Sequence, residues 1–176
     1  MKPKLTQDFL KESVSYDKET GEFSRKQRPI SHFKNARSMN SSNAKFANSP
    51  CGAITKGGYI SINVGGFSYL AHRLAWLYVY GNFPNNGMDH INSVKIDNRI
   101  SNLRECTQAE NMQNLKNPKA ENKCGFLGVH KVRNHKFRAL IVCGSIRKHL
   151  GYFRTPEEAH LAYISEKRKL HDFNEL

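Results

Sequence analysis

One stretch near the middle of the chain, MDHINSVKIDNRISNLRECTQAENMQN, constrains the fold more than any other. Residues 87–91 are short and flanked by apolar side chains, which predicts a strand, and residues 92–101 read as a polar loop. Residues 103–106 predict a second strand that pairs back on the first. Thr107 and Glu110 then form a capping-box pattern that begins a helix. The stretch therefore predicts a strand, a loop, a strand and a helix.

The dipeptide Asp89-His90 lies at the end of the first predicted strand and brings together two kinds of chemistry. Phosphodiester hydrolysis needs a base that activates water and a hard divalent cation held by oxygen ligands. An imidazole and a carboxylate can supply these two functions. An isolated Asp-His pair is usually an ordinary turn, and Asn-rich loops usually cap backbone groups. Here the dipeptide and several asparagines occur together in one predicted unit, which favours a catalytic site.

The blocks DHIN and DNRISNLR resemble the His-Asn-His (HNH) nucleases with the ββα-metal fold, in the variety common among phage homing endonucleases. The resemblance implies that His90 is the general base and that Asp89 is a metal ligand. It also implies that Asn102 ties the loop and orients the histidine, and that Asn111 is the second ligand. The implied cofactor is one Mg²⁺ or Mn²⁺ per active site. Spacings of twelve and then nine residues between His90, Asn102 and Asn111 agree with that family.

Two of these roles have competing candidates. Asn114 lies one turn beyond Asn111 on the same helix face and could replace it as the second ligand. Asn98 competes with Asn102 for the middle position, although the Asn-Leu-Arg context favours Asn102. The family usually has a glycine where this chain has Ser93, which leaves the conformation of that turn open.

The formal net charge of +13, from 28 Lys and Arg against 15 Asp and Glu, points to a polyanionic partner. Neutralising phosphates releases counterions and gives affinity that does not depend on sequence. Double-stranded DNA is the expected partner, and structured RNA is a weaker alternative. A membrane surface is disfavoured because the basic residues are spread along the chain.

A cytoplasmic protein is expected. No apolar run approaches the roughly 20 residues that a membrane span needs, and residues 1–17 lack the apolar core of a secretory signal. The resemblance implies a gene carried by a phage or mobile element in a bacterial host. The cysteines are widely separated, which predicts reduced thiols, although a zinc knuckle built from distant positions stays open. They are Cys51, Cys106, Cys124 and Cys143.

Residues 1–50 predict a short helix, a hairpin and a flexible basic segment. Tyr16 and Phe23 flank the turn of the hairpin, and the pattern Tyr-Asp-x-x-Thr-Gly-x-Phe also occurs in phage members of the family that the chain resembles. Residues 29–50 contain few large apolar side chains and many Ser, Asn, Lys and Arg. This composition is typical of a flexible loop.

Residues 51–115 form the predicted nuclease core, with the ββα-metal unit at 87–115. A second hairpin is expected before Leu70, and the apolar spacing over YLAHRLAWLYVY predicts a buried helix that ends at Gly81. On this helix His72 is interpreted as a core histidine, with support of the loop as the alternative. Arg73 and Arg99 are candidates for contact with DNA.

Residues 116–123 predict a linker, and residues 124–176 predict a second domain of three antiparallel strands and one helix. The blocks GFLGV, FRA, LGYF and TPEEA resemble the APETALA2-type DNA-binding domain. Strand alternation places one apolar set of side chains toward the helix. This set is Val129, Phe137, Ala139, Ile141 and Leu150.

The other face of this sheet is predicted to bind DNA, and basic residues of the first turn are predicted to contribute to the same contact. Arg can bind guanine or phosphate, and the sequence does not decide between them. The candidates are His130, Lys131, Arg133, Lys136, Arg138, Arg147 and His149.

The sequence thus predicts an α+β protein: a ββα-metal HNH module preceded by small hairpins and a helix, and followed by a three-stranded antiparallel sheet with one helix. The predicted function is a metal-dependent DNA endonuclease that nicks DNA or cuts both strands. The alternative is a DNA-binding regulator that keeps the HNH fold without cleaving. Monomer and homodimer both stay open.

Overall fold

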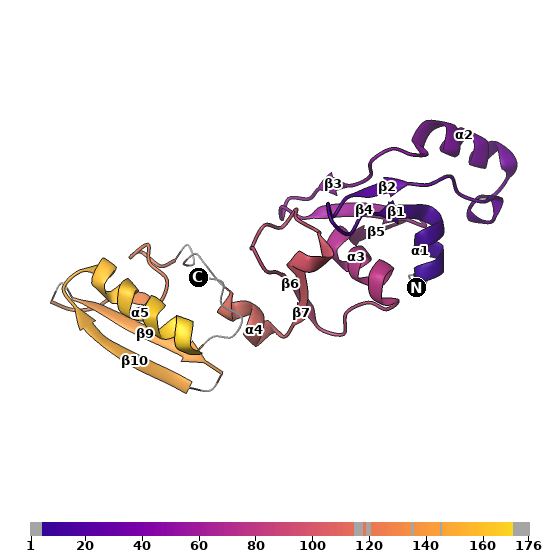
Figure 1. Ribbon diagram of the computed structural model, residues 1–176. Helices are drawn as coiled ribbons and strands as arrows, with labels where there is room; N and C mark the ends of the chain where they lie inside the picture. The colour runs from indigo at the N-terminus through magenta and orange to yellow at the C-terminus, as the bar shows by residue number, and fades with distance from the viewer. Residues whose placement is uncertain (1–4, 115–117, 119–120, 135, 145, 171–176) are drawn as a thin grey trace. The chain divides into compact units, whose positions relative to one another are not determined.

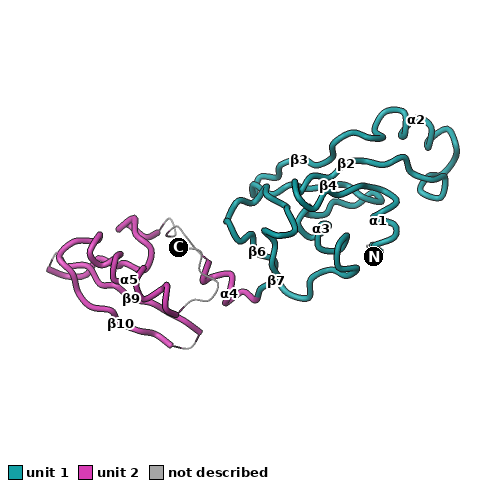
Figure 2. The backbone as a smooth tube through the Cα atoms, viewed as in Figure 1, with its two compact units in different colours: residues 1–106 teal, residues 107–176 magenta. Residues whose placement is uncertain are grey.

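The computed structural model describes residues 5–114, 118, 121–134, 136–144 and 146–170. Two compact units divide the chain, residues 1–106 and residues 107–176 (Figure 2). The boundary falls between the second strand and the helix of the strand-loop-strand-helix stretch. Residues 116, 117, 119 and 120 of the predicted linker lie outside the described residues.

Unit 1 combines helices with three small antiparallel sheets, as the prediction of an α+β fold requires (Figure 1). The sheets contain β1 and β2, then β3 to β5, then β6 and β7. In chain order the elements are α1 Gln7–Ser13, β1 Val14–Tyr16, β2 Phe23–Arg25, η1 Ile30–His32, α2 Ala36–Phe46, β3 Ala53–Ile54, β4 Ile60–Val64, β5 Phe67–Leu70, α3 Ala71–Tyr80, β6 Gly87–His90, η2 Ile100–Asn102 and β7 Leu103–Cys106.

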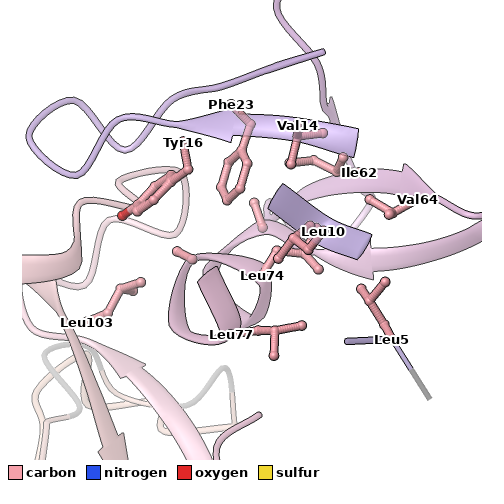
Figure 3. Close-up of a cluster of buried hydrophobic side chains, with 12 residues drawn as sticks. Leu5, Leu10, Val14, Tyr16, Phe23, Ile62, Val64, Leu74, Leu77 and Leu103 are labelled. Atoms are coloured by element: carbon pink, nitrogen blue, oxygen red, sulfur yellow. The ribbon is translucent and has the colours of Figure 1, made fainter. Parts of the chain in front are cut away.

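The core of unit 1 lies between α1, α3, the first hairpin and β4 (Figure 3). Leu10 of α1 and Leu74 of α3 are fully buried, and Ile62 of β4 is 2% exposed. Burying an aliphatic side chain of this size contributes about 1.5–3 kcal/mol. This core fixes α3, which ends where Gly81 takes a left-handed conformation, as predicted.

Residues 29–50 differ from the flexible loop that their composition predicts. They contain η1 and the eleven-residue helix α2. Asn35 caps α2 by accepting a hydrogen bond from Ser38 N. The loop prediction was wrong for α2. Composition correctly indicated that this segment has no apolar stripe facing the core, but it could not detect the local cap that stabilises the helix.

Unit 2 is a three-stranded antiparallel sheet with one helix against it, preceded by a short helix. The strand order is β10-β9-β8, and the core contains Val129, Ala139 and Ala159. Gly128 has a positive φ, and a Cβ there would overlap the ring of Tyr163, so only glycine fits. The elements are α4 Gln108–Gln113, β8 Val129–Lys131, β9 Phe137–Cys143, β10 Ile146–Phe153 and α5 Pro156–Leu170.

A register shift in β10 changes which side chains share the outer face of this sheet. Arg147 pairs with Val142 and His149 with Leu140, but after the shift between His149 and Gly151 it is Tyr152 that pairs with Arg138. Strict alternation would have grouped Tyr152 with the core residue Leu150. The irregularity instead places Tyr152 on the outer face, 60% exposed.

Among the described residues, no helix is both long and apolar enough to cross a membrane.

Candidate functional site

Asp89 and His90 lie at the end of β6, where β6 pairs with β7. Asp89 is opposite Arg104 and His90 is opposite Leu103. Both candidate side chains are buried, at 7% and 5% exposure. The carboxylate Oδ2 of Asp89 accepts from Arg104 Nη2 at 2.8 Å and from Nε at 3.0 Å. The second strand therefore holds this carboxylate with an ion pair that is largely shielded from water.

His90 is enclosed by aromatic rings. The His72 ring of α3 lies edge-on to it with a centroid distance of 5.0 Å, and the Tyr59 ring is 5.9 Å away. Burial lowers the pKa of His90, while an interaction with the Asn98 side chain and the nearby Asp89 oppose this change. The imidazole is therefore neutral at neutral pH, which is the form that can accept a proton.

His72 is a buried neutral histidine. Burial, followed by the nearby His90 and Arg73, lowers its pKa to about 4. Its Nδ1 atom is buried and has no hydrogen-bond partner within the part of the chain that the structure describes. Its burial agrees with the interpretation of His72 as a core histidine, and its ring packs against those of Tyr59 and His90.

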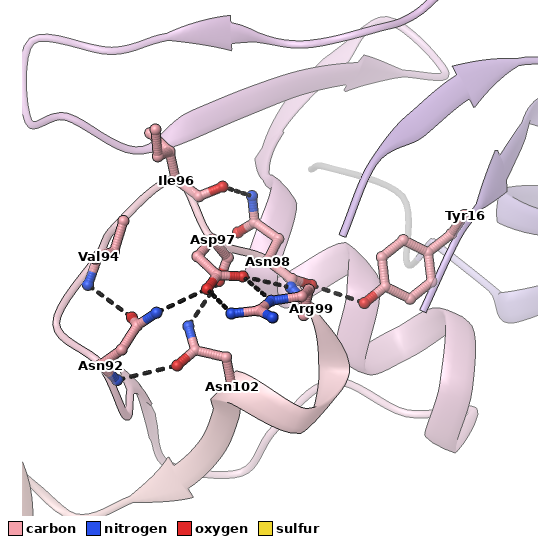
Figure 4. Close-up of polar contacts among 8 residues, drawn as sticks. All are labelled: Tyr16, Asn92, Val94, Ile96, Asp97, Asn98, Arg99 and Asn102. Carbon is pink, nitrogen blue, oxygen red and sulfur yellow. Dashed lines mark hydrogen bonds and ion pairs between the residues drawn. The ribbon is translucent and has the colours of Figure 1, made fainter. Parts of the chain in front are cut away.

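Asn102 ties the two ends of the loop together (Figure 4). Its Oδ1 accepts from Asn92 N at 3.0 Å, and its Nδ2 donates to the carbonyl oxygen of Asp97 at 2.9 Å. Its own carbonyl oxygen accepts from Ile91 N. These bonds fix the backbone on both sides of the loop directly after His90.

Asn98 also lies close enough to His90 to affect its pKa, whereas the role of Asn102 in orienting His90 stays a prediction. Asn98 is 1% exposed. Its Nδ2 donates to Ile96 O at 3.1 Å, and its buried Oδ1 has no hydrogen-bond partner among the described residues. Spacing along the sequence favoured Asn102 and did not reveal that Asn98 lies near His90.

Asp97 gathers the remaining polar groups of the loop. Arg99 binds it through two bonds, Nε to Oδ1 at 2.8 Å and Nη2 to Oδ2 at 2.6 Å, and Asn92 Nδ2 donates to Oδ2 at 2.7 Å. The bond from Arg99 is the main reason that the pKa of Asp97 falls to about 2. Arg99, predicted to contact DNA, therefore already has a carboxylate partner within the loop.

The N-terminal hairpin supports this loop from outside (Figure 4). Tyr16 OH donates to Asn98 O at 2.7 Å, and Ile100 N donates to Lys18 O. Gly21 has a φ of +76°, and a Cβ there would lie 2.5 Å from Arg99 N. The Tyr-Asp-x-x-Thr-Gly-x-Phe pattern was the signal for this contact, although the sequence alone indicated no chemical role for it.

Ser93 resolves the question left open by the missing glycine. It adopts a left-handed conformation with a φ of +64°. A side chain thus occupies a position that favours glycine, at a cost of roughly 1–2 kcal/mol. Serine therefore fills, in this chain, a backbone position that glycine adopts more readily.

The donor chemistry around Asp89 fits a hard divalent cation. Carboxylate and amide oxygens are ligands that Mg²⁺ accepts, and Mg²⁺ keeps several water or phosphate ligands. Among the described residues no group of three or more His, Cys, Asp and Glu gathers as a metal site. Within the described residues Asp89 is therefore the carboxylate that could hold a cation here, and water and substrate oxygens would supply further ligands.

The two candidates for the second ligand lie in the helical stretch of unit 2. Asn111 is exposed within α4, and Asn114 is the buried C-cap residue of that helix. Thr107 and Glu110 form the predicted capping box, with both reciprocal bonds present. Asn111 as the second ligand stays a prediction from the sequence pattern.

Most of the predicted DNA-contacting residues of unit 2 are exposed. Arg138 is the exception: it is half-buried, and its Nε atom has no hydrogen-bond partner among the described residues. The ring of Tyr152, which was not predicted for this face, lies tilted beside that of His149 with a centroid distance of 4.7 Å. The exposed residues are His130, Lys131, Arg133, Lys136, Arg147 and His149.

In unit 1, Arg73 is half-buried, with its guanidinium 5.7 Å from the centroid of the Phe83 ring. None of the four cysteines, all of which lie in the described part of the chain, forms a disulfide.

Comparison with known proteins gives a family match. Residues 69–113 match the family model described as HNH endonuclease, a range that contains Arg73, the Asp-His pair, both loop asparagines and Asn111. A solved structure described as DNA binding and cleavage by the HNH homing endonuclease I-HmuI is 22% identical. It covers 83% of this chain and 74% of its own, with a TM-score of 0.39. No curated protein sequence gives a significant match.

Proposed function

We propose that this chain, an HNH endonuclease over residues 69–113, hydrolyses phosphodiester bonds of double-stranded DNA with His90 as the general base. The observation that supports this most strongly is the environment of His90. It is a buried imidazole with the His72 ring edge-on at 5.0 Å, burial lowers its pKa, and Asn98 and Asp89 lie near enough to affect that pKa. A histidine held in this way is prepared to remove a proton from water.

In the proposed mechanism the DNA backbone approaches the end of β6. His90 accepts a proton from the attacking water on its ring, and the Asn98 side chain stabilises the resulting imidazolium. The loop bonds of Asn102 keep the backbone after His90 in place while the proton moves. A general base of this kind contributes roughly 10²–10⁴-fold to the rate.

Asp89 would hold the divalent cation, Mg²⁺ or Mn²⁺, with Asn111 as the predicted second ligand. When bound, the cation stabilises negative charge on the scissile phosphate and on the leaving 3′-oxygen. Before that, Asp89 is paired with Arg104, which keeps the buried carboxylate in place. Arg104 would then turn toward a phosphate oxygen.

Unit 2 would supply target recognition, as an APETALA2-like domain. Its outer face combines exposed basic residues with Tyr152, and the basic side chains suit phosphate and base contacts. One active site per chain makes a nick the simpler product. The phage or mobile-element context and the cytoplasmic location belong to the same proposal.

The test is nicking of a supercoiled plasmid by the full chain, with Mg²⁺ and with EDTA. We expect nicking that requires the cation and that falls by at least about 10²-fold in His90→Ala. Leu161→Ala is the control, because it truncates an exposed side chain of unit 2 that lies outside the site and outside the predicted DNA-binding face. The DNA affinity of His90→Ala should stay near that of the wild type.

Two results would contradict the proposal. Wild-type protein that binds DNA without nicking any substrate would indicate a regulator that keeps the fold. A His90→Ala variant that nicks as fast as the wild type would remove His90 from the mechanism.

A further inference from the structure

The segment from Arg25 to Ser49 of unit 1 contains positively charged side chains and no acidic ones. Between Glu22 and Asp89 the sequence contains no Asp or Glu. Most of the basic residues in that interval fall within this one segment, which we call the basic arm. They are Arg25, Lys26, Arg28, Lys34, Arg37 and Lys45.

The arm has a defined shape although it contributes no side chain to the core. Its two ends meet, because Arg25 N donates to Ser49 O at 2.8 Å and Asn48 N donates to Arg25 O at 2.7 Å. Within it, Arg28 Nη2 donates to Ser42 Oγ at 2.7 Å and Asn43 Nδ2 donates to Arg28 O at 2.9 Å. The arm is therefore a closed and internally bonded loop around α2.

The base of the arm is attached to α1. His32 of η1 stacks on Phe9 with a centroid distance of 4.0 Å, and its Nε2 lies 2.8 Å from Glu12 Oε2. Helix α2 itself lies at the end of unit 1 away from β6 and β7 (Figure 1). Any ligand of α2 would therefore lie away from Asp89 and His90.

Helix α2 has no buried residue. Its Ser and Asn side chains are poor helix formers, so neither a packed face nor intrinsic propensity explains why it is retained. Its surface offers hydroxyl, amide and cationic donors without a carboxylate. These are the groups that hydrogen-bond to phosphate oxygens in DNA complexes.

The arginines at the base of the arm point to the same kind of ligand. The Arg25 guanidinium lies over the Phe46 ring at 5.3 Å and that of Arg28 over the Phe33 ring at 4.5 Å. Burial and the nearby Arg25 lower the pKa of Arg28. Two like charges are thus held close together, and a polyanion would relieve their repulsion.

We propose that the basic arm binds the phosphate backbone of duplex DNA at a position flanking the cleavage site, as a contact separate from both the catalytic loop and unit 2. The inference rests on the proposed function, which supplies the duplex. It assigns to the arm affinity and placement on DNA rather than chemistry or base reading.

The variant to test is Lys34→Gln/Arg37→Gln/Lys45→Gln in the full chain, because these three side chains are exposed. The charge-matched control is Lys18→Gln/Arg154→Gln/Lys169→Gln, three exposed positions outside the arm and outside the outer sheet face. Both proteins are compared with wild type in binding to a long duplex over a series of salt concentrations, and in nicking of a supercoiled plasmid.

For the arm variant we expect weaker binding, with a salt dependence that falls by about 0.9 for each phosphate that the arm no longer neutralises. The nicking rate at saturating DNA should be unchanged, and the control should bind as the wild type does. Equal loss of affinity and salt dependence in the arm variant and the control would overturn the inference. Binding to structured RNA and to anionic vesicles is measured in parallel, and a loss of affinity confined to either of these ligands would also overturn it. A failure of the proposed function gives a different result: the wild-type protein binds DNA but does not nick it.

Discussion

The loop after His90 in unit 1, residues 91–102, and the outer sheet face of unit 2 use polar side chains in contrasting ways. In the loop, Asn92, Asp97 and Asn102 bind one another and the backbone. On the sheet face, Arg147 and His149 are exposed, and Tyr152 is 60% exposed. Under the proposed function, the difference teaches that positioning a proton acceptor needs polar groups satisfied within the protein, whereas recognition needs polar groups that a ligand can still satisfy.

The contrast predicts that the loop depends on the hairpin behind it. Gly21→Ala should have the largest effect, because its Cβ would meet the backbone of Arg99 at 2.5 Å and that of Asn98 at 2.6 Å. Backbone cannot move aside as a flexible side chain can. Overpacking of this kind costs about 1–3 kcal/mol, on top of roughly 1–2 kcal/mol for a left-handed alanine. Denaturant unfolding and plasmid nicking measure the two consequences.

Gly66→Ala is the control for this variant. Gly66 also has a positive φ, at +83°, but a Cβ there meets nothing within 4 Å. It should lose only the conformational part of the free energy of unfolding and keep its nicking rate. If both glycine variants behave alike, the hairpin does not support the loop.

The loop also shows how far the sequence could predict the site. The strands on either side, the capping box and the positions of Asp89 and His90 could be predicted because they depend on local periodicity and short-range caps. The contact between Tyr16 and Asn98 spans 82 positions. Nothing local marks a tyrosine in a hairpin as the donor to a distant carbonyl, so this part of the site required the structure.

A smaller effect is expected from Tyr16→Phe, which keeps the ring and removes the donor to Asn98 O. Burial raises the pKa of Tyr16, so its hydroxyl stays protonated and donates at all ordinary pH values. An unsatisfied buried carbonyl costs about 1–3 kcal/mol. Because Asn98 also interacts with His90, kcat should fall while KM stays near that of the wild type.

Tyr80→Phe separates this effect from the loss of any tyrosine hydroxyl. Tyr80 is 54% exposed, and its ring contact with Trp76 survives the change. This variant should keep both stability and kcat. Loss of stability in Tyr16→Phe with an unchanged kcat would mean that the hairpin stabilises the fold without positioning the base.

In unit 2 the strands and helix could be predicted from alternation and from the Thr-Pro-Glu-Glu cap, but the composition of the outer face could not. One irregularity, between His149 and Gly151, changes the parity of everything after it in β10. A one-residue shift exchanges the two faces of a strand. Alternation alone therefore predicted His149 and Arg147 for the outer face and missed Tyr152.

The smallest effect on the fold should come from Tyr152→Ala, because substitutions at exposed positions usually change stability by less than about 0.5 kcal/mol. The Tyr152 ring lies beside His149, and the residue is opposite Arg138 on the neighbouring strand. Tyr152 would therefore contact DNA only when the sheet face binds it. An aromatic anchor of this kind should contribute about 1 kcal/mol or more to binding.

Leu161→Ala, at a 69% exposed position of α5, is the matched control and should not change DNA affinity. Equal DNA affinities for Tyr152→Ala, Leu161→Ala and wild type would show that the register shift has no role in recognition. In that case unit 2 would have to bind DNA through a surface other than the one that contains Tyr152.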